Sequence, residues 1–146
     1  MRQPARHGDR ESGMSTVEVV LLAPLVLGFV LFLVCFGVLV DARGTVQGAA
    51  RDAARMGSLQ RDDLTANDSA YTAAAADLAN TCGGAFKVQQ VDPQTKAPSN
   101  AFVAGELYTI KVTCTVSLTG LDWFNIGSQT IISYSTAPLD VFRRTN

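Results

Sequence analysis

The most constraining feature of this chain is a run of 22 residues, Val19 to Val40, that carries no charged or strongly polar side chain. At about 1.5 Å per residue, a helix of this length spans about 33 Å, enough to cross a bilayer core of about 30 Å. The run therefore predicts one membrane-spanning helix. A removable secretory signal fits less well, because its apolar core normally has about 7–15 residues and the small residues after Val40 lie among Arg and Asp.

An acidic residue, Glu18, stands immediately before this run, and Gly13 lies five residues earlier. A carboxylate at the edge of a membrane helix is costly unless something pairs with it. Cleavage after Gly13 would create an α-amine on Met14, one helical turn from Glu18, and that amine can neutralise the carboxylate in the same chain or in a neighbour. This arrangement resembles the type IV prepilin signal, and the resemblance implies a polar leader over residues 1–13. The alternative is an ordinary signal anchor with a stray Glu near the interface.

The net charge and the length of the chain limit its partners and its number of domains. The formal net charge is −1 over 146 residues, which gives no reason to expect nucleic acid as a partner. The leader is weakly basic through Arg2, Arg6 and Arg10, which favours an N-terminus in the cytoplasm. About 100 residues remain after the leader and the apolar run, enough for one small domain.

Helical periodicity continues beyond the apolar run. Small and apolar residues recur at spacings of three and four, namely Val46, Ala49, Ala50, Ala53 and Met56. We therefore expect one continuous membrane-spanning and extended helix over residues 14–58. Pro24 removes one of its backbone hydrogen bonds and is expected to kink it.

Three arginines, Arg43, Arg51 and Arg55, lie on another face of this extension. One interpretation is a solvated face. The other is a contact surface for acidic groups of adjacent subunits or for lipid phosphates.

Residues 59–146 predict a small extracytoplasmic domain. A second helix is expected from about Asp68 to Asn80, capped by Asn67 or Asp68, before the glycines at 83–84. Its buried face is expected to comprise Tyr71, Ala74, Ala75 and Leu78.

The periodicity then changes to two, which indicates strands. Residues 86–91, 108–118 and 129–136 are the expected strands, and the second has the clearest alternation: Tyr108, Ile110, Val112, Cys114, Val116 and Leu118 on one face, Thr and Lys on the other. The predicted fold class is α+β: a long N-terminal transmembrane helix that extends into a small domain with a short helix and an antiparallel sheet of about three strands.

The cysteines fit an exported domain. Cys82 and Cys114 have no metal-type spacing, so a disulfide is the simplest interpretation, and two unpaired buried thiols are the alternative. Cys35 lies within the apolar run and should behave as a small hydrophobe.

Catalytic chemistry is not indicated. The one histidine, His7, lies in the leader, and no nucleophile–base pair, metal-ligand cluster or phosphate loop can be assembled from the rest. Asp62, Asp63 and Asp68 lack the ligand spacing of a calcium loop. No enzyme activity, cofactor or metal site is therefore predicted. Trp123 and Phe124 are either an exposed contact surface or a plug folded over the sheet.

Two stretches carry a family resemblance. Residues 15–25 contain Glu18 with Pro24 six residues later, and residues 47–55 form an Ala- and Arg-rich helix extension. Together they resemble the TadE-like proteins, the minor pilins (pseudopilins) of tight-adherence pili, a branch of the type IV pilus systems. Val19 stands where the major pilins usually have Tyr, and the chain is much longer than those subunits, which favours a minor component.

The resemblance implies a function and a location. A prepilin peptidase would cut between Gly13 and Met14 of a single-pass protein in the bacterial cytoplasmic membrane, with its N-terminus in the cytoplasm and its C-terminal domain outside. Glu18 and Pro24 would serve subunit register and assembly. The implied partners are other pilin subunits, the inner-membrane assembly platform and the lipid bilayer, and the mature protein would reside in the membrane or in the pilus. The alternative is a signal-anchored extracytoplasmic binding module that never enters a filament.

Overall fold

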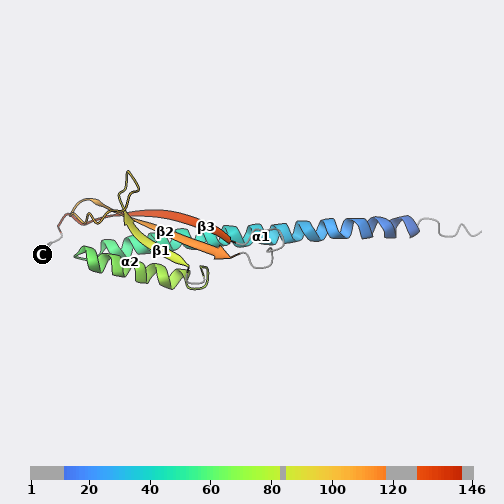
Figure 1. Cartoon of the computed structure of the whole chain (residues 1–146), viewed down its shortest axis with the longest axis horizontal. Coiled ribbons are helices and arrows are strands. Elements are labelled where there is room, and N and C mark those ends of the chain that lie inside the picture. The colour runs from blue at the N-terminus through green and yellow to red at the C-terminus, as the bar shows by residue number, and fades with distance from the viewer. Residues whose placement is uncertain (1–11, 83–84, 118–127, 143–146) are drawn as a thin grey trace, which may run out of the picture. The chain divides into compact units, whose positions relative to one another are not determined.

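The structure, a computed structural model, describes residues 12–82, 85–117 and 128–142. Two helices precede a three-stranded antiparallel sheet (Figure 1), and the elements are α1 (Ser12–Ser58), α2 (Asp63–Leu78), β1 (Phe86–Val91), β2 (Leu107–Ser117) and β3 (Ser128–Pro138). The predicted α+β class is confirmed, and so is the order of its elements.

The chain divides into two compact units, one ending at Val38 and the other beginning at Leu39. Helix α1 contributes to both. In the first unit its side chains are mainly exposed, whereas in the second unit one stripe of α1 belongs to a hydrophobic core. One helix therefore has two kinds of surface along its length.

The sheet has β2 at its centre, antiparallel to both neighbours. Ile110 lies opposite Gln90 of β1 and Ser135 of β3, which fixes the register. The predicted alternation along β2 is confirmed, because the inward residues Tyr108, Ile110, Val112, Cys114 and Val116 are all buried. The outward-facing residues from Lys111 to Thr115 are only half-buried. Thr109, predicted for the same outer face, is buried instead, and its hydroxyl lies 2.9 Å from that of Thr136. Leu118, predicted for the same inner face, lies outside the described residues.

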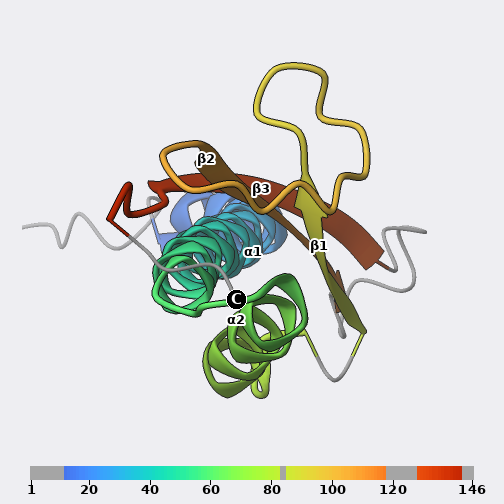
Figure 2. The ribbon, with the colours of Figure 1, turned by 90° about the vertical axis from the view of Figure 1, so that its left-hand side faces the viewer.

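Both helices cover the same face of the sheet (Figure 2), and residues from all of these elements form one core. The part of α1 that belongs to it is made of small residues, namely Ala42, Val46, Ala49, Ala50, Ala53 and Ala54. Alanine side chains let a helix backbone approach its neighbours closely while burying apolar surface. Met56, expected on this face, is 44% exposed instead, two residues before the helix ends.

Gly57 packs against the sheet at this end of α1. A Cβ atom on Gly57 would come within 2.8 Å of Cζ and Oη of Tyr108, so only glycine fits without a shift. The Tyr108 hydroxyl donates to Oδ1 of Asn67 at 3.2 Å, and Nδ2 of Asn67 donates to Oδ1 of Asp63 at 3.0 Å. Burial, helped by the negative charge of Asp63, raises the pKa of Tyr108 above its usual value. Tyr108 thus ties β2 to both helices.

Helix α2 begins five residues earlier than predicted, at Asp63 rather than Asp68. The cap is Asp62, whose carboxylate accepts from the backbone N–H of Thr65 at 2.9 Å and from its hydroxyl at 2.8 Å. The backbone bond and then the hydroxyl bond from Thr65 hold the pKa of Asp62 below its usual value. A carboxylate satisfies the otherwise unpaired N–H groups of a first turn, so the helix starts there.

The buried face of α2 also differs in part from the prediction. Residues four apart form its buried stripe: Ala66, Ala70, Ala74 and Leu78. Ala75 is half-buried and Tyr71 is exposed. The Tyr71 ring stacks on that of Phe86 with centroids 5.4 Å apart, so it covers the side of β1 rather than the centre of the core.

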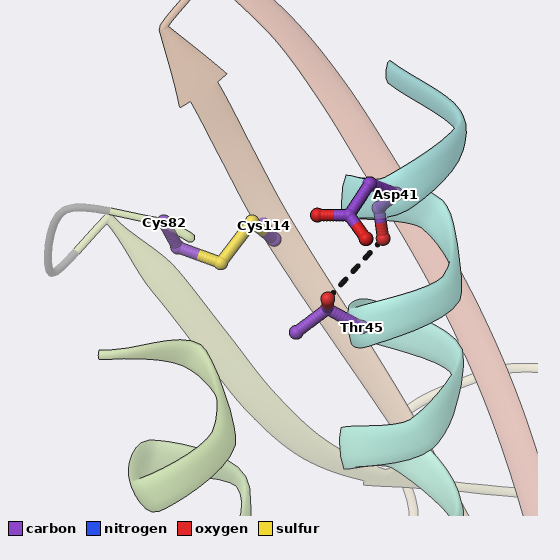
Figure 3. The surroundings of a disulfide bond; sticks show 4 residues. All are labelled: Asp41, Thr45, Cys82 and Cys114. Atoms are coloured by element: carbon purple, nitrogen blue, oxygen red, sulfur yellow. Dashed lines mark hydrogen bonds between the residues drawn. A yellow bond between two sulfur atoms is a disulfide. The ribbon is translucent and has the colours of Figure 1, made fainter. Parts of the chain in front are cut away.

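The predicted disulfide is present between Cys82 and Cys114, with their Cα atoms 5.6 Å apart (Figure 3). It joins the segment after α2 to the central strand across 32 positions of sequence. In the chain-entropy model such a cross-link stabilises a domain by about 3–4 kcal/mol. On α1 nearby, the Thr45 hydroxyl donates to the carbonyl of Asp41 at 3.2 Å. Cys35 is a free, half-buried thiol.

Candidate functional site

The first unit exposes an apolar surface, which is energetically unfavourable in water. Every large apolar side chain from Val17 to Val38 is between 47% and 71% exposed. Along the described chain, α1 is the one helix long and apolar enough to cross a membrane. Exposure on all sides distinguishes it from a core helix, which hides one stripe against a sheet. The helix therefore indicates membrane anchoring.

The residues of the predicted cleavage site lie at the start of this helix. Gly13 and Met14 belong to the first turn of α1, which begins at Ser12. Glu18 is exposed and lies four positions after Met14, a rise of about 6 Å along the axis. The helical backbone thus brings residues 14 and 18 to adjacent turns on one side of α1.

Pro24 lies in the interior of α1, and the helix continues through it. Proline has no N–H, so the carbonyl of Val20 loses its usual donor four residues on. In hydrocarbon such a carbonyl needs another partner, from a side chain or a neighbouring helix. A second helix packed beside Pro24 could therefore supply the hydrogen-bond donor that this carbonyl lacks.

The three arginines of the extension lie outside the core. Arg43, Arg51 and Arg55 are all exposed, and none forms an ion pair within the described residues. The face is available to solvent, lipid or protein, so the choice between the two interpretations stays open. Trp123 and Phe124 lie outside the described residues. In the same described part of the chain, no three His, Cys, Asp or Glu side chains could hold a metal ion.

Comparison with protein families finds one similarity, and it lies on this helix. Residues 13–55 match the model of a family described as TadE-like protein. This segment is TadE-like. It begins at Gly13, includes Glu18 and Pro24, and ends within the Ala- and Arg-rich half of α1, so it covers both stretches that carried the resemblance. Searches of curated proteins and of solved structures found no match to the chain.

The TadE-like match supports a pilus-related, minor-pilin role and makes other pilus components the expected class of partner. The family is a structural component of pili and is not known as an enzyme. The match stops at Arg55, before α2 and the sheet, so the domain that follows has to be interpreted from its own geometry.

Sequence reasoning missed two structural residues near this segment. Gly57 lies in the last turn of the predicted helix, and its lack of a side chain leaves room for Tyr108. Asp62 caps α2 by accepting from the N–H of Thr65, and Asp is one of the residue types favoured at that position. The cap could have been found from sequence, whereas the contact at Gly57 depends on the tertiary fold.

Proposed function

We propose that this protein is a minor pilin, or pseudopilin, a non-catalytic structural subunit in the assembly of a tight-adherence, type IV-related pilus. One observation carries the proposal: Gly13 and Glu18 stand at the start of an exposed apolar helix, within the TadE-like segment. A signal anchor needs the apolar helix but has no use for a carboxylate at that position.

The proposed processing divides the chain into a leader of residues 1–13, a helix over 14–58 and an extracytoplasmic domain over 59–146. The leader lies in the cytoplasm, and a prepilin peptidase cuts between Gly13 and Met14. The new α-amine of one subunit then pairs with Glu18 of another as the helices pack together. A carboxylate in an apolar bundle is expensive unless paired, so this contact favours one axial register over its neighbours.

The remaining surfaces would serve contacts with partners. Pro24 frees a carbonyl that a neighbouring helix can satisfy. Arg43, Arg51 and Arg55 provide a cationic face for acidic groups of adjacent subunits or for lipid phosphates. Trp123 and Phe124 are further candidates for contact. The proposed partners are other pilin subunits, the inner-membrane assembly platform and the bilayer.

The first test is the N-terminus and intact mass of the full chain from membranes of its native host. We expect a chain that starts at Met14, and a Gly13→Val variant that keeps the leader. A wild-type chain that still starts at Met1 would remove the amine that Glu18 is to meet. The signal-anchored binding module would then be the better explanation.

The second part of the test separates assembly from anchoring. Glu18→Ala should insert into the membrane as well as the wild type, yet be lost from the sheared pilus fraction. Asp41→Ala is the matched control, since Asp41 is an exposed acid on the same helix just beyond the apolar run, and it should assemble normally. Equal recovery of Glu18→Ala and wild type in pili would contradict the role in register.

A further inference from the structure

Strand β3 presents a long open edge. It pairs with β2 on one side, and on the other side no strand of the described residues pairs with it. Its 11 residues include no charged side chain, and its one proline is the final residue, Pro138. Proteins usually protect an edge with a short strand, a lysine, a proline or a covering loop, because unpaired N–H and C=O groups accept another strand.

The opposite edge is protected in the usual ways. Strand β1 has only six residues and carries an exposed Lys87. Its end is covered by the following loop, where the N–H of Ser99 donates to the carbonyl of Gln90 at 3.2 Å and Val91 bridges to Pro98. The two edges therefore differ, because described residues cover the edge of β1 and leave the edge of β3 open.

A groove of about 370 Å³ runs beside the first half of β3. One wall is the flank of α1 formed by residues four apart, Leu39, Arg43 and Gln47, and the other is residues 129–133 of β3. The eight steps from residue 39 to residue 47 of the helix extend about 12 Å, and five strand residues extend about 13–17 Å. The groove therefore has room for an extended segment of about five residues.

The walls specify the chemistry of that segment. A strand added to the edge directs alternate side chains to opposite sides of the sheet. On the helix side they would meet half-buried Leu39, buried Ile131 and exposed Arg43. Arg43 is the one charged residue that lines the groove, and it forms no ion pair with the described part of the chain. A segment that complements these residues would carry an apolar, an acidic and an apolar side chain at every second position.

We propose that the free edge of β3 is the docking site for an extended acidic segment of a partner protein, which adds as a fourth strand and places a carboxylate beside Arg43. The main-chain bonds of such an addition supply affinity, and the side chains facing the groove supply specificity. The proposal concerns the second unit alone and stands whether or not the chain enters a pilus.

Strand addition has a signature that a peptide can report. The probe is the peptide Thr-Val-Thr-Glu-Thr-Val-Thr, titrated by calorimetry against the full chain in nanodiscs of zwitterionic lipid. Two further versions are N-methylated on alternate residues, one on the odd and one on the even positions. Because successive N–H groups of a strand point to opposite edges, one version should bind like the parent and the other should not. Binding of both versions, or no binding of the parent peptide, would overturn the proposal.

Charge reversal tests the assignment to Arg43. Arg43→Glu should weaken binding of the Glu peptide about fivefold at low salt and strengthen binding of the matching Lys peptide. Arg51→Glu is the control, because it makes the same charge change on α1 outside the groove. An equal effect from both variants would show that the peptide responds to the overall charge of the protein. That result would overturn the assignment of the docking site to this groove.

A second copy of the chain is the competing occupant of this edge. We expect sedimentation of the full chain in micelles to show no self-association of the kind that added parent peptide would reverse. A dimer that this peptide dissociates would assign the edge to self-pairing and overturn the acidic partner.

Discussion

At the scale of single residues, the glycines of α1 separate into two kinds. A Cβ atom on Gly57 would overlap the Tyr108 ring, whereas Cβ atoms on Gly44 or Gly48 would meet nothing within 4 Å. Glycine inside a helix costs roughly 0.5–1 kcal/mol relative to alanine. At Gly57 the close approach of Tyr108 explains why glycine is present despite this cost. At Gly44 and Gly48 no contact among the described residues requires glycine.

We expect Gly57→Ala to destabilise the second unit by about 1–2 kcal/mol, because overpacking costs about 1–3 kcal/mol and the gain in helix propensity offsets only part of it. Gly48→Ala is the matched control and should stabilise by about 0.5–1 kcal/mol. Urea unfolding of the full chain in micelles, followed by near-ultraviolet circular dichroism, measures both. A Gly57→Ala chain as stable as Gly48→Ala would show that Tyr108 moves aside at no cost.

At the scale of elements, one helix performs two tasks by changing its surface. Up to Val38, α1 is covered by large apolar side chains on all sides, which suits hydrocarbon. From Ala42 onward its apolar surface narrows to one stripe of small residues, and charged residues occupy the opposite face. The second pattern suits a helix that packs on a sheet in water.

Helix α2 depends more than α1 on a covalent link for its attachment to the sheet. Its buried stripe is mostly alanine, so it buries little apolar area per residue, and the disulfide secures the segment that follows it to β2. We expect the double substitution Cys82→Ser with Cys114→Ser to lower the free energy of unfolding by about 3–4 kcal/mol. Reductant should destabilise the wild type by a similar amount and leave the double variant unchanged. Cys35→Ser is the control, and a loss there as large as in the double variant would contradict this account.

At the scale of the whole molecule, the membrane helix and the disulfide both suit a chain whose second unit is outside the cytoplasm. We expect trypsin added to intact spheroplasts to cleave this unit, because Arg61, Lys87 and Lys96 are exposed there. A cytoplasmic protein serves as the control for intact cells. Cleavage that occurs only after lysis would place the domain inside and reverse the predicted orientation.

The sequence by itself determined the features that follow from its longest periodic runs. The uninterrupted apolar run specified the membrane-type helix, and the alternation from Tyr108 to Val116 specified a strand with one buried face. Residues 15–25 and 47–55 together suggested the TadE-like family, which the match over residues 13–55 bears out. The cysteine pair followed from elimination of other roles, and the disulfide is present.

Only the tertiary structure decided which residues meet across the chain. Met56 and Tyr71 have the right spacing for buried faces, yet both are exposed, because periodicity gives the side of a helix and not the extent of what covers it. The contact between Gly57 and Tyr108 joins positions 51 residues apart in the sequence, and nothing local signals it. The open edge of β3 has the same origin. A strand's own residues predict that it pairs, but the order of strands in the sheet decides which edge is left without a partner.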